Sequence, residues 1–151
     1  MAIILIKAVD AQNLLDVCGL TTHQNGMGAN SKGCPCCNAV SIAEAKYNPE
    51  MHPNAIYHNH VLIGFFLYQR AETQADTATI CRFMLDSQFQ QKGLEEKALE
   101  HILRGLKIQG VRNVIFLADD ANEEAKNLSL SFGFQFTGKS EHNECCYALA
   151  L

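Results

Sequence analysis

The sequence contains no long hydrophobic run and no change of composition that would mark a second domain. None of its apolar stretches approaches the roughly 20 residues that a membrane-spanning helix needs. The first six residues are apolar but have no basic segment before them, and Asp10 follows soon after. We therefore expect no secretory signal and a cytoplasmic protein. No repeat, low-complexity tract or linker divides the chain. Its 151 residues therefore suit a single domain with one core, residues 1–151.

Positive charge is also scarce. The chain has 12 Lys and Arg against 16 Asp and Glu, a formal net charge of -4. Nonspecific nucleic-acid binding needs clustered basic residues, so we expect no nucleic-acid partner, and no membrane partner either. The composition, 48% apolar and 19% charged, is that of a globular rather than a disordered protein. Such an acidic chain would not repel a polycationic small molecule.

Cysteine is plentiful, but its pattern disfavours disulfides. The seven cysteines are an odd number and include two adjacent pairs, which bridge poorly because the bond would strain the peptide between them. We expect reduced thiols. Cys34, Cys36 and Cys37 form the densest group, yet zinc sites usually add a second ligand pair at a distance. The favoured interpretation is that these are incidental thiols in a loop. The alternatives are a loop that contacts the substrate, or a redox or metal function. We expect no metal.

Hydrophobic periodicity predicts strands and helices that alternate along the chain. A helix carries its apolar stripe from Leu94 to Leu106 and ends at Gly110, and a second begins at an N-cap, Asn122, and ends at Gly133. Expected strands cover residues 2–9, 54–57, 61–68, 77–86, 114–118, 134–137 and 145–151. Shorter helices are expected over residues 10–20, with Asp10 as N-cap, and over residues 41–47. A loop is expected at 21–40 and a hairpin turn at 58–60. This order predicts an α/β (α+β) fold.

The most informative stretch runs from Arg82 to Leu94. A strand ends at Asp86, a short polar loop with one glycine follows, and a long amphipathic helix begins. The first turn of a helix carries unpaired N–H groups and the positive end of the dipole, and Gly93 allows close approach of the backbone. A diphosphate would dock there readily. An ordinary strand-to-helix connection is an equally good interpretation of this segment alone.

Residues 90–95, Gln-Gln-Lys-Gly-Leu-Glu, resemble the acetyl-CoA signature of the GNAT superfamily of N-acetyltransferases: Arg or Gln, two residues, Gly, one residue, then Gly or Ala. Residues 41–50, 54–57, 62–65 and 83–99 are similar to the spermine/spermidine acetyltransferase branch of that superfamily. The resemblance continues through Asn122 and Leu128 and is weakest over residues 21–40. It implies the GNAT acyl-CoA N-acyltransferase fold, a central mixed, mostly antiparallel sheet flanked by helices.

The resemblance also implies a reaction and a set of site residues. The expected function is N-acetyltransfer from acetyl-CoA, as co-substrate, to a small primary amine such as a polyamine, in a protein that could be a homodimer. The backbone N–H near Leu85 is expected to face the thioester carbonyl and act catalytically. The residues expected to bind the coenzyme are Phe83, Met84, Leu85, Gln90, Gln91, Lys92, Gly93, Leu94, Glu95 and Asn122.

Two positions depart from the pattern of the superfamily. Glu95 stands where the signature has a small residue, either beside the expected phosphates or, as we favour, pointing to solvent and stabilising the helix dipole. Ser129 stands where many relatives have a tyrosine that protonates the departing thiolate, and serine is a far weaker acid. Ser129 is a catalytic candidate that could hold a water, although a surface serine with no role is the favoured interpretation. The alternative function is therefore a weakened protein that binds acyl-CoA or a partner without efficient turnover.

Overall fold

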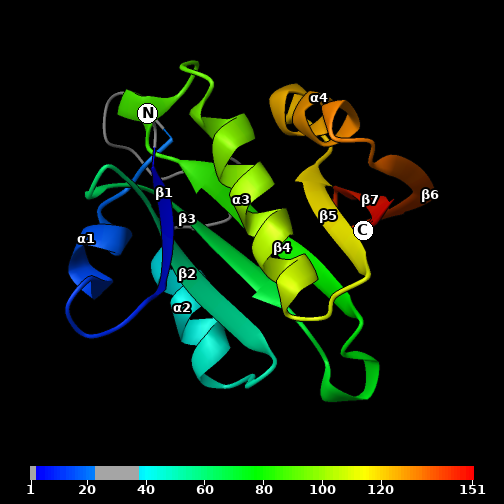
Figure 1. Ribbon diagram of the computed structural model, residues 1–151, viewed down its shortest axis with the longest axis horizontal. Helices are drawn as coiled ribbons and strands as arrows, with labels where there is room; N and C mark the ends of the chain where they lie inside the picture. Colours follow the sequence, from blue (N-terminus) through cyan, green and yellow to red (C-terminus); the bar gives the residue numbers. More distant parts are fainter. Residues whose placement is uncertain (1–2, 23–37) are drawn as a thin grey trace.

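A computed structural model describes residues 3–22 and 38–151 of the chain (Figure 1). The strands are β1 (Ile4–Ala8), β2 (Met51–His58), β3 (Val61–Gln69), β4 (Thr77–Leu85), β5 (Asn113–Asp119), β6 (Gln135–Glu141) and β7 (Glu144–Ala150). The helices are α1 (Leu14–Cys18), α2 (Asn38–Lys46), α3 (Leu94–Ile108) and α4 (Glu123–Ser131), with short 3-10 helices η1 (Glu72–Gln74) and η2 (Ser87–Phe89).

The strands form one sheet in the order β1-β2-β3-β4-β5-β7-β6. Only the central neighbours β4 and β5 run parallel, and every other neighbouring pair is antiparallel. A parallel pair needs a crossover connection, and α3 supplies it between β4 and β5. The expected mixed, mostly antiparallel sheet flanked by helices is confirmed.

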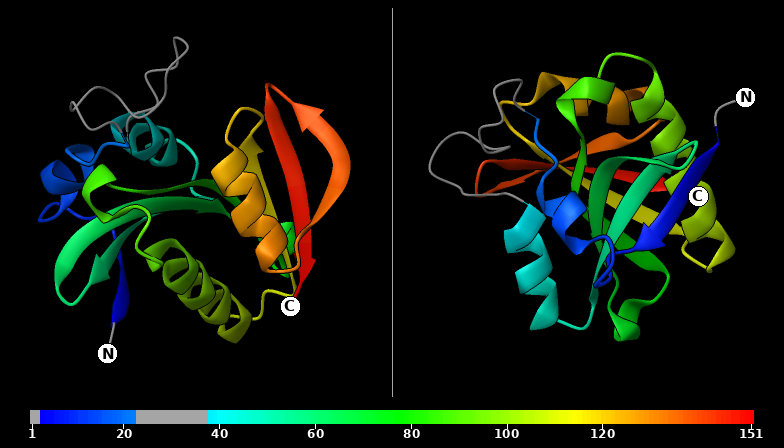
Figure 2. Two further views of the ribbon diagram at one scale, coloured as in Figure 1. Left: turned by 90° about the horizontal axis from the view of Figure 1, so that it is seen from above. Right: turned by 90° about the vertical axis from the view of Figure 1, so that its left-hand side faces the viewer.

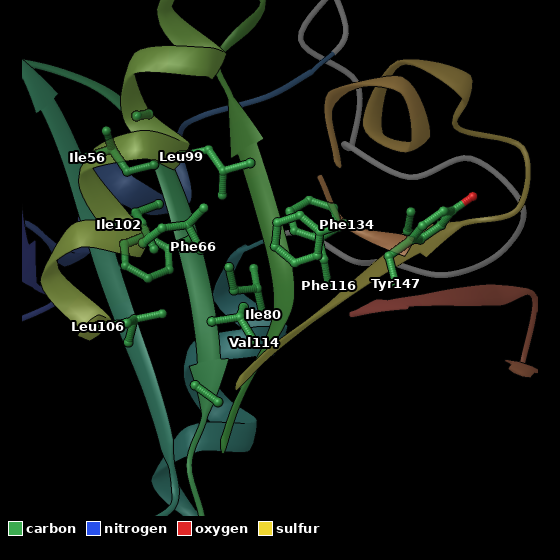
Figure 3. Packing of buried hydrophobic residues seen from close by; sticks show 14 of the residues in the cluster. Ile56, Phe66, Ile80, Leu99, Ile102, Leu106, Val114, Phe116, Phe134 and Tyr147 are labelled. Atoms are coloured by element: carbon green, nitrogen blue, oxygen red, sulfur yellow. The ribbon is translucent and has the colours of Figure 1, made fainter. Parts of the chain in front are cut away.

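Helices cover both faces of the sheet. Figure 2 shows α3 on the opposite side of β2, β3 and β4 from α1 and α2. The apolar stripe of α3 is buried as its spacing predicts, since Leu94, Ala98, Leu99, Ile102, Leu103 and Leu106 all lie in the core. Figure 3 shows Leu99, Ile102 and Leu106 facing Phe66 and Ile80 of the sheet. Burial of each such leucine stabilises the fold by about 2 kcal/mol, so packing on the sheet fixes where α3 lies.

The first helix differs from expectation. α1 spans only Leu14–Cys18, and its N-cap is Asn13 rather than Asp10. The Oδ1 atom of Asp10 accepts hydrogen bonds from the N–H groups of Gln12 and Asn13, at 2.9 and 3.0 Å. Asp10 thus forms a turn ahead of the helix, an alternative that short acidic side chains offer the backbone.

Most other helix and strand ends differ from the predicted ones by a few residues. α2 begins at Asn38, inside the expected loop, and β2 begins at Met51. The hairpin turn between β2 and β3 is confirmed, because Asn59 and His60 have φ angles of 50° and 71°, as a two-residue hairpin loop requires. None of the helices in residues 3–22 and 38–151 is long and apolar enough to cross a membrane.

The feature that creates a site is the separation of β4 and β5. Their pairing runs only from Thr77 and Asn113 to Ile80 and Phe116. Beyond it β4 continues to Leu85 and β5 to Asp119 without pairing with each other. A bulge in the β3–β4 register at this point bends β4, as bulges do. The two strands diverge toward the end of the sheet at which α3 and α4 begin (Figure 1).

Candidate active site

The inner edge of β4 presents unpaired backbone groups to the gap. Leu85 faces Gly64 of β3, and the N–H of the next residue, Asp86, donates to the carbonyl of Ile63 at 2.8 Å. In an antiparallel ladder this makes Gly64 and Leu85 a non-hydrogen-bonded pair, so the N–H of Leu85 points away from β3. The N–H of Phe83, two residues earlier, points the same way. Both donors therefore face the space where β5 has parted from β4.

A cavity of about 370 Å³ opens at this gap. Its walls come from β4, the loop after it, the first turn of α3, one face of α4 and the segment that follows α1. The lining residues are Thr22, Phe83, Met84, Leu85, Gln90, Gln91, Glu95, Glu96, Asn122, Glu124, Ala125, Asn127, Leu128 and Ser131. A volume of this size is typical of a small-molecule site. Nine of the fourteen lining residues are polar or charged, and the other five are apolar.

Hydrogen bonds shape the loop between β4 and α3. Buried Asp86 caps η2 by accepting from the N–H of Gln88, and its Oδ1 also accepts from the N–H of Thr21 at 2.9 Å. The side chain of Gln90 donates to the carbonyl of Leu85 at 2.9 Å. This bond satisfies the Leu85 carbonyl and leaves the N–H of that residue as the donor facing the cavity.

The start of α3 has no side-chain cap. Its N-cap is Gly93, which has a φ of 76°, and no side chain there accepts a bond from the first turn. A Cβ at this position would meet no atom within 4 Å, so glycine is favoured by the left-handed backbone and not by crowding. The helix therefore begins without a capping side chain, an arrangement that suits an anionic ligand.

Seven of the ten residues expected to bind a coenzyme line the cavity: Phe83, Met84, Leu85, Gln90, Gln91, Glu95 and Asn122. The other three do not. Lys92 and Gly93 are exposed beside the cavity, and Leu94, the first residue of α3, is 6% exposed and packs in the core.

Glu95 does not point to solvent, so the favoured sequence interpretation was wrong. Its side chain lines the cavity, and its Oε1 atom is buried without a hydrogen-bond partner among the described residues. Burial raises the pKa of Glu95, the nearby Glu96 and Glu124 carboxylates raise it further, and the N–H groups of Gln91 and of Glu95 itself lower it. Leu94, the first residue of the apolar stripe, turns into the core, which leaves the next residue facing the cleft.

Asn122 and Ser129 occupy different environments on α4. Asn122 caps the helix, as predicted, by accepting from the N–H of Ala125 at 3.0 Å, and it also lines the cavity. Ser129 is fully buried, so the expectation of a surface serine was wrong. Its hydroxyl donates to the carbonyl of Lys126 at 2.8 Å, and it is not among the residues that line the cavity. A part for Ser129 in the reaction remains a prediction.

Several lining residues were missed by the sequence interpretation. Glu124, Asn127 and Ser131 follow one another at spacings of three and four residues, the period of one helix face. That period could have placed these three residues on one face of the predicted helix. Thr22 could not have been found, because the bond from Thr21 to Asp86 that brings this segment to the cavity joins residues far apart in sequence.

The cysteines do not form a recognisable centre in the described structure. Cys34, Cys36 and Cys37 lie outside the described residues. In the part that is described, no group of three His, Cys, Asp or Glu side chains could hold a metal ion. Burial is the main reason that the pKa of Cys81 rises to about 11, so this thiol stays protonated at neutral pH.

A protein-family comparison agrees with this geometry. The model of the Acetyltransferase (GNAT) family matches residues 31–134. The chain belongs to the GNAT family. Among curated proteins, this GNAT chain is 26% identical over 144 residues to the spermine/spermidine N(1)-acetyltransferase of Bacillus subtilis (strain 168), with 91% of each chain covered.

Solved structures show the same fold. The chain is similar to an acetyltransferase from Thermus thermophilus, with a TM-score of 0.75, 19% identity and coverage of 98% of this chain and 97% of that one. It is also similar to the PaiA N-acetyltransferase from Thermoplasma acidophilum, crystallised in complex with coenzyme A, with a TM-score of 0.69, 14% identity, and coverage of 98% and 99%. Both likenesses establish the GNAT fold.

Proposed function

We propose that this GNAT protein transfers the acetyl group of acetyl-CoA to a primary amine of a small cationic acceptor, with a polyamine as the first candidate. The observation that carries the proposal is the unpaired edge of β4, whose N–H groups face a cavity at the uncapped start of α3. An extended amide-bearing arm can pair with a free strand edge, and a diphosphate suits free N–H groups at a helix start.

The residues present fit such a coenzyme. Phe83 and Leu85 would offer backbone donors to its pantetheine arm and thioester, and the loop of Gln90 and Gln91 would lie against its phosphates. Asn122 would bound the site from α4. The orphaned Oε1 of Glu95 also fits, since a buried polar atom without a partner is one that a ligand can satisfy. When bound, acetyl-CoA supplies the activated acetyl group.

In the proposed reaction the N–H of Leu85 donates to the thioester carbonyl oxygen. The neutral acceptor amine attacks the carbonyl carbon, an N–C bond forms, the C–S bond breaks, and the amine gives up a proton to water or a nearby carboxylate. Negative charge develops on the carbonyl oxygen during attack, so a fixed hydrogen-bond donor there accelerates the step. In other enzymes, loss of one such donor lowers kcat by about 10²–10³-fold. Holding both substrates in line supplies much of the remaining acceleration.

The cationic acceptor is proposed on two grounds. The chain carries a net charge of -4, which favours a polycation over an anionic acceptor. The B. subtilis relative, 26% identical, is named for acetylation of spermine and spermidine. The hydroxyl of Ser129 is engaged by its own helix, so we assign it no proton transfer and expect the thiolate to be protonated by water.

Titration calorimetry with acetyl-CoA, followed by a thiol-release assay over an amine panel that begins with spermidine, tests the proposal. We expect one site per chain with micromolar affinity, and CoA release that requires an amine. Tight binding without CoA release from any amine would make the protein a coenzyme binder instead. A folded protein that does not bind acetyl-CoA would remove the enzyme assignment and leave the fold.

A further inference from the structure

The coenzyme cavity contains a carboxylate at the place that best suits an anion. Glu95 lies in the first turn of α3, lines the cavity and is half-buried. Its Oε1 atom is fully enclosed but accepts no hydrogen bond from the described residues. The N–H groups of Gln91 and Glu95 act on the carboxyl group as a whole, so Oε1 is the atom left without a donor. An enclosed oxygen without a donor is costly for the free protein, and a ligand in the cavity could satisfy it.

The charges that surround Glu95 are all negative. On α3 its neighbour Glu96 lines the same cavity, and α4 contributes Glu124. The remaining walls, from β4, the loop after it and the segment that follows α1, carry no charge at neutral pH: Phe83, Met84, Leu85, Gln90, Gln91 and Thr22. No Lys, Arg or His is among the described lining residues, and Lys92 on the loop is exposed outside the cavity.

Burial, the largest effect, and these carboxylates favour the neutral form of Glu95. They outweigh the N–H groups of Gln91 and Glu95, which favour the ionised form, so the pKa of Glu95 is raised. An ionised carboxylate has only acceptor oxygens and would repel a diphosphate, which likewise only accepts. A protonated carboxyl has one O–H donor, which a phosphate oxygen can accept. The same side chain is therefore an obstacle when ionised and a ligand when protonated.

We propose that Glu95 binds the coenzyme as the protonated acid, donating its O–H to a diphosphate oxygen, so that acetyl-CoA binding takes up a proton. The proton comes from the solvent and joins the Glu95 carboxylate, and no covalent bond to the coenzyme changes. The inference rests on the proposed function, because it requires that acetyl-CoA occupy this cavity.

Calorimetric titration with acetyl-CoA at pH 8, in buffers of low and high ionisation enthalpy, measures the uptake directly. At this pH a phosphate monoester, with a second pKa near 6, is already ionised, and its contribution is common to all variants. We expect up to one proton bound per coenzyme by the unmodified protein and none by Glu95→Gln. Because the amide of this variant needs no proton, we also expect the variant to bind at least about tenfold more tightly at pH 8.

Two glutamate variants on the same helix serve as controls. Glu100 is exposed, pairs with Arg104 at 2.9 Å and does not line the cavity, so Glu100→Gln should keep the full uptake. Glu96→Gln removes a neighbouring charge and should keep a measurable uptake. If uptake disappears in Glu96→Gln and persists in Glu95→Gln, the proton belongs to Glu96 and the proposal is overturned.

The pH dependence gives a second readout. Affinity of the unmodified protein should fall up to tenfold for each pH unit above the pKa of Glu95 in the free protein, while that of Glu95→Gln should stay level. Binding without proton uptake, and with equal affinity in the two proteins, would refute the role of Glu95 and leave the coenzyme site intact. No binding by either protein from pH 6 to 8 would instead refute the proposed function.

Discussion

The two helices that begin at the cavity have opposite kinds of N-terminus. α4 starts at Asn122, whose side chain accepts from the N–H of Ala125. α3 starts at Gly93, which has no side chain to cap the first turn. Each helix has two glutamates in that turn, Glu95 and Glu96 on α3, and Glu123 and Glu124 on α4.

The surroundings of these glutamates also differ. On α4, Lys126 lies 3.6 Å from Glu123 and 3.1 Å from Asp120, so part of the negative charge is paired at the surface. Within the described residues no ion pair reaches Glu95 or Glu96. A helix start that supplies its own cap serves stability, whereas one left open beside a cavity is available to a ligand. Four substitutions test this contrast, from the largest expected effect to the smallest.

Gly93→Asp should have the largest effect. It puts a negative charge at the open helix start and disfavours the backbone with φ of 76°, so we expect acetyl-CoA affinity to fall by about 100-fold or more. Calorimetry and a thermal unfolding curve would separate lost binding from lost folding. Gly105→Ala, within α3 at a site with no atom near the added Cβ, should leave affinity unchanged. Unchanged affinity in Gly93→Asp would place the phosphates elsewhere.

Glu95→Gly should come next and act in the opposite direction. Removal of the carboxylate should tighten acetyl-CoA binding about tenfold at pH 8, with a smaller gain at lower pH where the acid form is available as a donor. Glu123→Gly is the matched control, since each variant should lose helix stability of about 1 kcal/mol or less. The control should bind acetyl-CoA with the affinity of the unmodified protein. An equal gain in affinity in both variants would mean that the effect comes from the net charge of the protein and not from the position of Glu95.

Asn122→Ala should mainly affect stability. Loss of the α4 cap should lower the free energy of unfolding by about 1 kcal/mol, measured by urea denaturation. Asn122→Ser keeps a capping oxygen and should recover most of the loss. Equal destabilisation by both replacements would mean that Asn122 stabilises α4 by something other than its cap.

The smallest effect should appear in the pH dependence of stability. The folded-state pKa of Glu95 is raised, so the folded protein favours the protonated acid, and stability from this group is lost as pH rises through that pKa. Glu95→Gln should therefore be more stable than the unmodified protein at pH 8 and equal to it near pH 4. Urea midpoints at both pH values measure the difference, and an identical difference at the two would mean that Glu95 titrates normally.

Much of the fold could be predicted from local patterns. The stripe from Leu94 to Leu106 has a helical period, and the positions it marked are those that α3 buries. The ends of α1 and α2 were harder to predict, because short helices depend on packing and on turns such as that made by Asp10.

The site was predictable where one segment of chain forms it. Phe83, Leu85 and Gln90 lie on a strand and its adjoining loop, and all three line the cavity. The directions of Glu95 and Ser129 were predicted wrongly. The direction of each side chain depends on which side of its helix packs on the sheet. A side chain at a position next to an apolar stripe can face either solvent or a cleft.

The sequence by itself determined the order of strands and helices, the open helix start at Gly93 and the cap at Asn122, because backbone conformation and capping depend on residues within a few positions. Only the tertiary structure decided that β4 and β5 separate after Ile80 and that α4 lies across the gap from α3. It also decided that Glu95, Glu96 and Glu124 share one cavity. Those outcomes depend on contacts between residues far apart in the chain, which arise only when the whole core packs.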